Sequence, residues 1–337
     1  MKAVVLVGGE GTRMRPLTET IPKPLIPFMN RPFLDHVLDH LAGHGVEEVI
    51  CSSPYLQDEF RSFLAGRRGT PAVTWITEEE PLGTCGAIVG ALDHLDDAFL
   101  VLNGDVLTDL DLGVLIAYHR ERGAVASIAL APVDDARPYG LVETSPDGAV
   151  RAFREKPADP TPGTINAGTY VLERGALDRV PRGTMVSIER ETFPDLIARG
   201  EPVFGFPSDA YWRDLGTPAA YLAAHEDALA GRIGGRTYPR PLLGEGSEVG
   251  RGAEVGDGVV LGPGARVGDG ARIDRSVLHA RAKVGERAEV EGTLAGPGAE
   301  VGPGAIVRDA VLAEGARVAP DAVVEGQGVR PGAVAGA

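Results

Sequence analysis

The chain has 337 residues, of which 43% are hydrophobic and 5% aromatic, and this length predicts two domains. Its formal net charge of −15 argues against nucleic acid or anionic membrane surfaces as partners, because the field of the whole molecule would repel them. No apolar run reaches the ~18 residues that span a bilayer. Cys51 and Cys85 have neither a CxxC spacing nor a disulfide framework, so a cytoplasmic location is expected.

The first predicted strand, residues 3–7, is entirely apolar and leads into a glycine-rich turn. The turn contains Gly8, Gly9, Gly11, Thr12 and Arg13. Glycines let backbone N–H groups approach an anion closely, and an arginine binds phosphate oxygens in a bidentate manner. The turn lacks the Gly-Lys-Ser/Thr of a Walker A loop, and Met14 stands where a dinucleotide fingerprint needs a third glycine. Taken alone, it is also compatible with an ordinary tight turn.

A rare lysine follows this turn. Lysine occurs at only four of the 33 basic positions, and one of them, Lys23, lies between Pro22 and Pro24. Proline fixes φ, so this backbone would hold the ammonium group over a phosphate at low entropic cost. The alternative is a solvent-exposed proline turn. Residues 1–33 carry five basic side chains against two acidic ones, which favours a small anionic ligand.

The chain up to residue 230 alternates strand-like and helix-like patterns. The predicted elements are a helix over 33–43, a strand over 47–52, a helix over 86–95, a strand over 98–102, a helix over 110–122 and a strand over 124–131. This order predicts an α/β domain with a Rossmann-like, mostly parallel sheet covered by helices on both faces. Ligands of such sheets bind at the carboxyl ends of the strands.

The last third of the chain has a different character. No aromatic residue follows Tyr238, and aliphatic residues recur every six positions in a series that breaks at His279, resumes at Val284, resumes again at Val301, and takes a five-residue step to Leu312. The series comprises Val249, Val255, Leu261, Val267, Ile273, Val284, Val290, Val301, Val307, Leu312, Val318 and Val324. Such hexads predict a left-handed parallel β-helix with one inward aliphatic residue per strand. The count reaches an interior position at His279, where the alternatives are a break in the coil or a loop residue. The predicted organisation is a catalytic domain over 1–230, a linker over 231–243, the β-helix over 244–328 and a tail over 329–337.

The run from residue 3 to residue 41 resembles the N-terminal signature of the nucleotide-sugar pyrophosphorylases, G-G-x-G-T-R-L-R-P-L-T followed by P-K-P. Further matching segments are Glu80-Pro81-Leu82-Gly83-Thr84, Asn103-Gly104-Asp105, Tyr139-Gly140, Glu155-Lys156-Pro157, Asn166-Ala167-Gly168, Ser187-Ile188-Glu189-Arg190-Glu191 and Tyr211-Trp212-Arg213-Asp214. Within the family the chain looks most like the GDP-mannose pyrophosphorylases, also called mannose-1-phosphate guanylyltransferases. Met14 replaces the usual leucine, which conserves volume.

The resemblance implies a set of site residues. Those implied as catalytic are Arg13, Lys23, Asp105 and Asp214, and the two aspartates would bind Mg²⁺ together with phosphate oxygens. Those implied to bind the nucleotide are Leu6, Gly8, Gly9, Gly11, Thr12, Arg13, Glu80, Gly83 and Asn103. Those implied to bind the sugar phosphate are Gly140, Glu155, Lys156 and Asn166. The C-terminal β-helix also fits the family, and its faces and ends favour a homo-oligomer.

The base is inferred from hydrogen-bond chemistry. Guanine presents two adjacent donors, which one ionised carboxylate can accept, and Glu78, Glu79 and Glu80 offer such a group. Together with the resemblance, which implies mannose-1-phosphate as the second substrate, this gives the expected reaction: GTP plus mannose-1-phosphate to GDP-mannose plus pyrophosphate, by in-line displacement. One alternative is a UTP- or dTTP-dependent glucose-1-phosphate nucleotidyltransferase. Others are a non-catalytic subunit that senses nucleotide sugars, and a bifunctional enzyme whose β-helix transfers an acyl group with His279.

Overall fold

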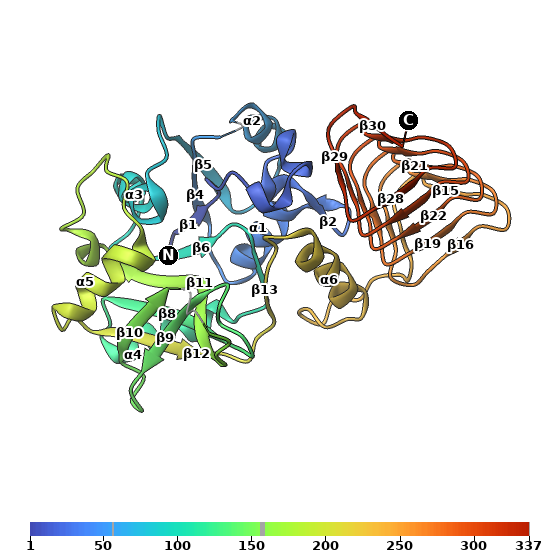
Figure 1. Cartoon of the computed structure of the whole chain (residues 1–337). Coiled ribbons are helices and arrows are strands. Elements are labelled where there is room, and N and C mark those ends of the chain that lie inside the picture. Colours follow the sequence, from blue (N-terminus) through green and yellow to red (C-terminus); the bar gives the residue numbers. More distant parts are fainter. Residues whose placement is uncertain (56, 156–158, 337) are drawn as a thin grey trace. The chain divides into compact units, whose positions relative to one another are not determined.

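The computed structural model describes residues 1–55, 57–155 and 159–336 (Figure 1). The chain forms two compact units, one of Met1–Gly9 with Leu34–Trp212 and one of Glu10–Phe33 with Arg213–Ala337. The second unit thus contains an N-terminal segment that sequence position alone would assign to the catalytic domain. The predicted boundaries after residues 230, 243 and 328 stay predictions.

One sheet of nine strands organises the first unit, in the order β10-β9-β11-β6-β1-β4-β5, with β8 pairing β11 and β12. Its strands are β1 Ala3–Leu6, β4 Glu48–Ser53, β5 Ala72–Thr77, β6 Ala98–Asn103, β8 Ala126–Val133, β9 Gly140–Thr144, β10 Val150–Glu155, β11 Gly163–Glu173 and β12 Val203–Pro207. The strands β6, β1, β4 and β5 are parallel, whereas β11 runs antiparallel to β6, β8 and β9. The predicted α/β class is confirmed, with a mixed sheet.

Helices cover this sheet, and short elements connect it. The helices are α1 Phe33–Gly43, α2 Gln57–Gly66, α3 Gly83–Ala91, α4 Leu112–Arg122 and α5 Phe193–Ala198. The short elements are β7 Val106–Thr108, β13 Trp212–Asp214, the 3-10 turns Leu92–His94 and Arg174–Leu177, and a π-turn Ile188–Thr192. Helix α3 packs against β1 and β4, and α5 packs against β10 and β12. The residues of β1 from Ala3 to Val5 are fully buried, as expected for a central parallel strand.

The carboxyl ends of β4, β1 and β6 are in register. Leu6 pairs with Ser52 on one side and with Asn103 on the other. Gly104 comes next, and its N–H donates to the Leu6 carbonyl at 2.9 Å. A Cβ atom on Gly104 would lie 2.7 Å from that same oxygen, so only glycine permits this approach. The sheet therefore presents these three strand ends along one edge.

The second unit joins an N-terminal segment, one long helix and the β-helix. The segment contains 3-10 turns Thr12–Met14, Leu17–Glu19 and Lys23–Leu25, and a short hairpin of β2 Pro27–Phe28 and β3 Arg31–Pro32. The long helix is α6, Pro218–Leu229, and its first turn is capped by the Thr217 side chain, which accepts from the Ala220 N–H. Asparagine and proline side chains of the segment lie against the β-helix, since Asn30 donates to the Leu261 carbonyl and Pro16 contacts Gly328.

The β-helix consists of three parallel sheets, which confirms the predicted architecture. The first sheet holds β14 Leu242–Leu243, β17 Val260–Leu261, β20 Val277–Leu278, β23 Leu294–Ala295, β26 Val311–Leu312 and β29 Gly328–Val329. The second holds β15 Glu248–Val249, β18 Arg266–Val267, β21 Lys283–Val284, β24 Glu300–Val301, β27 Arg317–Val318 and β30 Val334–Ala335. The third holds β16 Glu254–Val255, β19 Arg272–Asp274, β22 Glu289–Glu291, β25 Ile306–Arg308 and β28 Val323–Glu325.

One corner of each later coil is a residue shorter than the hexad count predicts. Leu261 pairs with Leu278, and Leu278 pairs with Ala295. Leu278 and Ala295 therefore fill interior positions that are missing from the six-residue series. Leu278 therefore occupies the interior position that the six-residue count gives to His279, and His279 itself follows β20 in a corner of the coil, in agreement with the loop alternative. The shorter corner uses a left-handed residue such as Arg275, with φ of 43°, or Asp309, with φ of 49°.

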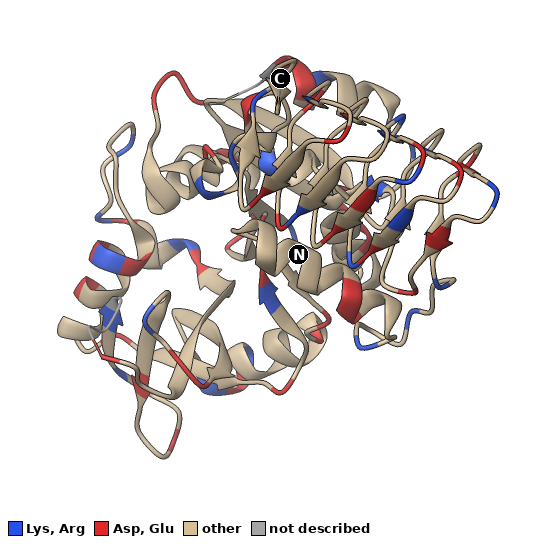
Figure 2. Cartoon of the chain, turned by 45° about the vertical axis from the view of Figure 1, so that its right-hand side comes forward, with Lys and Arg blue, Asp and Glu red and all other residues tan. Residues whose placement is uncertain are grey.

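The outer surfaces of the three sheets differ. Charged residues of neighbouring coils pair across the second and third sheets, as between Lys283 and Glu300 at 2.7 Å (Figure 2). On the first sheet the corresponding residues are apolar and buried, among them Val260, Val277 and Leu294. The N-terminal segment and α6 contact this apolar sheet and its corners, since the Tyr221 ring lies 6.4 Å from the His279 ring between centroids.

Candidate active site

The first unit places several predicted nucleotide contacts at the aligned strand ends. Leu6 ends β1, and Gly8 lies close enough to β4 that a Cβ would be 3.7 Å from the Ser52 carbonyl. Asn103 ends β6, and its buried Oδ1 accepts no hydrogen bond from the residues that the structure describes. A buried acceptor without a donor is costly, so this amide is suited to accept from a bound ligand. Gly168, with φ of 71°, leaves room for the Asn103 side chain, since a Cβ there would lie 2.6 Å from Nδ2.

The three consecutive glutamates of the acidic loop occupy different surroundings. Glu78 is buried, and its carboxylate accepts from Ser52 Oγ at 2.7 Å and from the Leu82 N–H at 3.0 Å. Glu80 is exposed. The sequence alone could not show which of the three glutamates is buried, because three identical side chains in a row form no pattern of polar and apolar residues. Glu80 as a base contact stays a prediction, and Glu78 joins it as the carboxylate held beside the end of β4.

Gly83 owes its identity to packing. Its φ is +68°, and a Cβ there would lie 2.7 Å from the Val186 carbonyl. Next to it, Thr84 Oγ1 donates to Glu189 Oε2 at 2.8 Å and accepts from the Ile188 N–H at the same distance. These contacts fasten the start of α3 to the segment that precedes α5. The fold alone therefore accounts for glycine at this position, and a nucleotide contact by Gly83 stays a prediction.

The predicted sugar-phosphate contacts lie on adjacent strands. Gly140 pairs directly with Glu155 across β9 and β10, and Leu141 pairs with Ile165 of β11, the residue before Asn166. Lys156 lies outside the described residues. The register thus brings Gly140, Glu155 and Asn166 into one part of the sheet.

The side chain of Asn166 is fixed by two contacts. Its Nδ2 donates to the Tyr170 hydroxyl at 2.7 Å, and its Oδ1 accepts from the Gly168 N–H at 2.9 Å. Burial, with a smaller contribution from the Glu189 carboxylate, raises the pKa of Tyr170 well above its usual value, so this hydroxyl stays protonated. Nearby, Trp212 Nε1 donates to the Ala167 carbonyl at 2.9 Å. Three of the signature segments therefore meet around β11.

In the second unit the glycine turn becomes a 3-10 turn that presents Arg13. Gly11 caps this turn with φ of 62°, and Thr18 Oγ1 donates to its carbonyl at 2.8 Å. A Cβ on Gly11 would lie 2.9 Å from the Thr18 methyl group, so the close packing requires glycine. Met14 is fully buried beneath the turn. The arginine side chain is thereby held at the surface by a rigid backbone.

Three of the four predicted catalytic residues meet in this unit. Arg13 Nη2 lies 3.3 Å from Asp214 Oδ2, and Lys23 Nζ lies 3.8 Å from Asp214 Oδ1. The Lys23 side chain is 9% exposed and that of Asp214 is 18% exposed, whereas that of Arg13 is 58% exposed. Gly216 leaves space for this group, since a Cβ there would collide with the Arg13 guanidinium. Two cations that share one carboxylate are well arranged to bind a polyphosphate.

Asp105 belongs to the first unit, where it follows Gly104 between β6 and β7 and is half-buried. Both predicted metal ligands are carboxylates, which suit Mg²⁺. Within the described part of the chain no group of three or more His, Cys, Asp or Glu side chains is placed to hold a metal ion. Asp105 and Asp214 belong to different units, so a shared magnesium site stays a prediction; the carboxylate chemistry of each suits Mg²⁺, which one or two carboxylates and substrate phosphates commonly hold.

The residue that the acyl-transfer alternative requires does not fit its role. His279 is 2% exposed, and neither ring nitrogen has a hydrogen-bond partner among the described residues. Burial lowers its pKa to about 4. A catalytic base needs access to its substrate, so the structure argues against acyl transfer at this histidine.

Comparison with protein families places the chain in a class. The family described as Nucleotidyl transferase matches residues 2–231, and the family described as GMPPB C-terminal domain matches residues 238–333. The chain therefore belongs to the nucleotidyl transferase family, as the sequence motifs predicted. None of its described helices is long and apolar enough to cross a membrane.

Individual relatives narrow the comparison. The mannose-1-phosphate guanylyltransferase of Mycobacterium tuberculosis is 44% identical over 232 residues, which are 68% of this chain and 65% of the relative. The probable mannose-1-phosphate guanylyltransferase 2 of Arabidopsis thaliana is 40% identical over 234 residues, 66% of this chain and 63% of the relative. The UTP–glucose-1-phosphate uridylyltransferase of Synechocystis sp. is 33% identical over 250 residues, 69% of this chain and 64% of the relative. These matches thus span less than two thirds of each relative.

Solved structures agree with the fold. HddC from Yersinia pseudotuberculosis superimposes with a TM-score of 0.60 and 32% identity, over 66% of this chain and 97% of that one. A second structure of HddC, complexed with GMP-PN, gives a TM-score of 0.59 at the same identity.

Proposed function

We propose that this protein transfers a guanylyl group from GTP to mannose-1-phosphate, which produces GDP-mannose and pyrophosphate. The observation that carries the proposal is the cluster of Arg13, Lys23 and Asp214, on a chain whose relatives include mannose-1-phosphate guanylyltransferases at 37–44% identity. A purely sensing subunit would not need this charged set, so catalysis is favoured over regulation.

The proposed reaction is an in-line displacement. An oxygen of the sugar phosphate attacks the α-phosphorus, a new P–O bond forms, and the bond to the leaving pyrophosphate breaks with its electron pair. Arg13 binds the triphosphate and stabilises the charge that develops on pyrophosphate. Lys23, which is nearly buried, neutralises charge near the α-phosphate, where a low dielectric strengthens the interaction. No covalent enzyme intermediate is required.

Asp105 and Asp214 are the proposed ligands of Mg²⁺, together with phosphate oxygens. When bound, the ion would supply charge neutralisation at the phosphates. Asp214 is ion-paired with Arg13 and Lys23. Phosphate oxygens of the substrate would compete with this carboxylate for both cations.

The remaining contacts are assigned to the two parts of the first unit. Glu80 or the buried Glu78 would accept the N1–H and N2 amino donors of guanine, and the Asn103 carbonyl would accept a further hydrogen bond. Glu155, Lys156 and Asn166 would bind the sugar phosphate, with Gly140 beside them. We also propose a cytoplasmic homo-oligomer, which light scattering of the purified protein would test.

A substrate panel tests the proposal. The purified protein is incubated with Mg²⁺ and GTP, UTP or dTTP, each with mannose-1-phosphate or glucose-1-phosphate, and pyrophosphate release is measured. We expect the highest kcat/KM for GTP with mannose-1-phosphate. A higher kcat/KM for UTP with glucose-1-phosphate would show that the substrates are instead those named for the Synechocystis relative. No release from any pair would overturn the proposed activity.

A further inference from the structure

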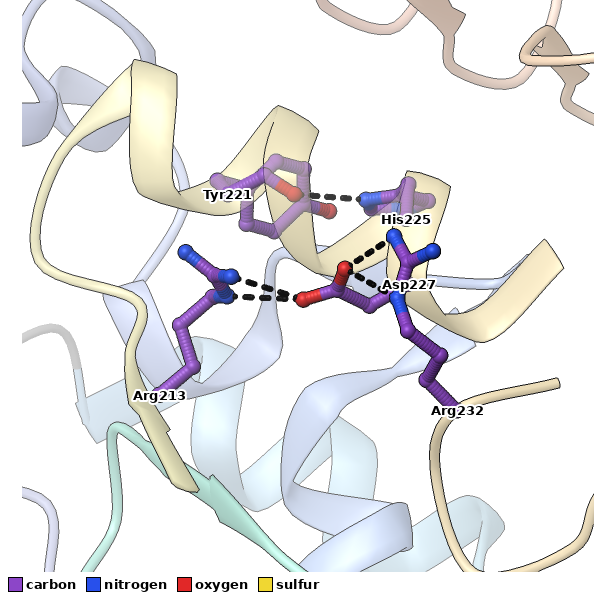
Figure 3. Close-up of polar contacts among 5 residues, drawn as sticks. All are labelled: Arg213, Tyr221, His225, Asp227 and Arg232. Atoms are coloured by element: carbon purple, nitrogen blue, oxygen red, sulfur yellow. Dashed lines mark hydrogen bonds and ion pairs between the residues drawn. The ribbon is translucent and has the colours of Figure 1, made fainter. Parts of the chain in front are cut away.

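A carboxylate outside the predicted site holds two arginines. Asp227, near the end of α6, is 6% exposed. Its Oδ2 accepts from Arg213 Nε at 3.1 Å and Nη2 at 2.7 Å, and its Oδ1 accepts from Arg232 Nε at 2.8 Å and from Arg232 Nη2 (Figure 3). Each carboxylate oxygen therefore serves one guanidinium.

Arg213 is the residue immediately before Asp214 in β13. Because its Nε and Nη2 both bind the same oxygen of Asp227, the guanidinium is held in one orientation, and the backbone at its base is restrained with it. That backbone continues directly into the aspartate that faces Arg13 and Lys23. The geometry thus links a helix residue to the position of the Asp214 carboxylate.

The same helix fastens the segment that carries the lysine. The Tyr221 hydroxyl donates to the Pro27 carbonyl. One turn further, His225 Nε2 accepts from the Met29 N–H at 3.2 Å, while its Nδ1 contacts the Tyr221 carbonyl at 3.0 Å (Figure 3). Pro27 and Met29 come after the 3-10 turn that begins at Lys23. Helix α6 therefore restrains both partners of the Lys23–Asp214 pair.

We propose that Asp227 is a positioning residue, which acts through Arg213 to hold Asp214 where it binds the divalent metal. This inference rests on the proposed function, in which Asp214 is a metal ligand. A buried ion pair is weak evidence for stability, because the cost of desolvating its charges offsets their attraction. Its bidentate geometry beside a proposed metal ligand instead indicates a role in orientation. Groups that orient metal ligands typically change metal affinity by ~10–100-fold when removed.

The test measures metal binding directly. The full-length protein with GTP is titrated with Mn²⁺, and the electron paramagnetic resonance signal of free Mn²⁺ is recorded. We expect Asp227→Asn and Arg213→Lys to weaken Mn²⁺ binding by ~10-fold. Arg213→Lys keeps the charge but removes the fork. Arg232→Met is the matched control, because it removes the other arm of Asp227 and leaves the Arg213 contacts in place, so native affinity is expected.

Two outcomes would overturn the inference. One is native Mn²⁺ affinity in Arg213→Lys and Asp227→Asn proteins whose circular dichroism is native. The other is an equal loss in Arg232→Met, which would assign the effect to the helix end as a whole. If Asp227→Asn does not fold, Arg213→Lys decides the question. Asp214→Asn separates the proposals, since native binding by that variant would refute the metal assignment itself.

Discussion

The ion pairs on the coils of the β-helix and those around Asp214 use the same residue types in different surroundings. Arg272 lies 3.0 Å from Glu254 of the neighbouring coil, and about two thirds of each side chain stays exposed, 64% and 67%. Lys23 and Asp227, by contrast, are nearly buried. The coil pairs repeat with the coil, whereas the Asp214 cluster joins residues from distant parts of the chain.

The difference in exposure changes how much each kind of ion pair contributes to the free energy of the folded protein. An exposed pair contributes ~0–1 kcal/mol, because water and salt screen it. A buried charge depends on its partner, and removing that partner typically costs ~3–5 kcal/mol. Regular charges on the coils are therefore expected to tolerate substitution. The irregular charges around Asp214, which include the nearly buried Lys23 and the exposed Arg13, are expected to control activity.

The largest effect is expected from the catalytic charges. Arg13→Ala and Asp105→Ala should each lower pyrophosphate release from GTP and mannose-1-phosphate by ~10²–10³-fold. The first variant loses the guanidinium that binds the triphosphate, and the second loses a proposed ligand of the Mg²⁺ that would neutralise the phosphates. Turnover is measured at saturating substrates, with circular dichroism to verify folding. Near-native rates in both variants would show that neither residue takes part in catalysis. These charges would then be as tolerant of substitution as those on the coils.

A smaller effect concerns stability at low pH. His279 is buried with its pKa lowered to about 4, so the folded protein keeps it neutral while the unfolded chain, with a pKa near 6.5, takes up a proton. Its contribution to stability is present above pH ~6.5 and is lost as the pH falls toward 4, by about 3 kcal/mol in all. Urea unfolding at pH 7, 6 and 5 should show this loss in the native protein and a weaker one in His279→Leu.

The exposed His94 provides the control for this measurement. His94→Leu makes the same replacement of histidine by leucine at an exposed position, and this variant should keep the native dependence of the free energy of unfolding on pH. An identical pH dependence of the native protein and His279→Leu would contradict the burial argument.

The smallest effect is expected on the coils. Arg272→Gln removes the exposed pair with Glu254 and should leave the midpoint of urea unfolding and the turnover nearly unchanged, because water and salt screen an exposed pair. The midpoint of urea unfolding and the rate of pyrophosphate release measure the two quantities. A clear fall in the urea midpoint would show that the charge pairs between coils are a structural requirement.

Local patterns were enough to predict much of this protein. The apolar run of β1, the glycine turn with Arg13 and the spacing of Val284 or Ile273 are properties of a few neighbouring residues, and all appear in the structure as expected. The motif resemblance likewise selected Lys23 and Asp214, because a motif records residue identity at fixed spacing. Features that depend only on short-range order and residue identity are therefore visible in the sequence without the fold.

Other features depend on which residues the fold buries together. One corner of each later coil is one residue shorter, because a left-handed residue such as Arg275 makes a tighter turn there. The interior position is therefore Leu278 and not the next residue, His279. Glu78 is buried whereas its neighbour Glu80 is exposed, and Asp227 is paired with Arg213, fourteen residues away in the sequence. Solvent exposure and long-range pairing arise only when distant segments pack, so no pattern along the chain contains them.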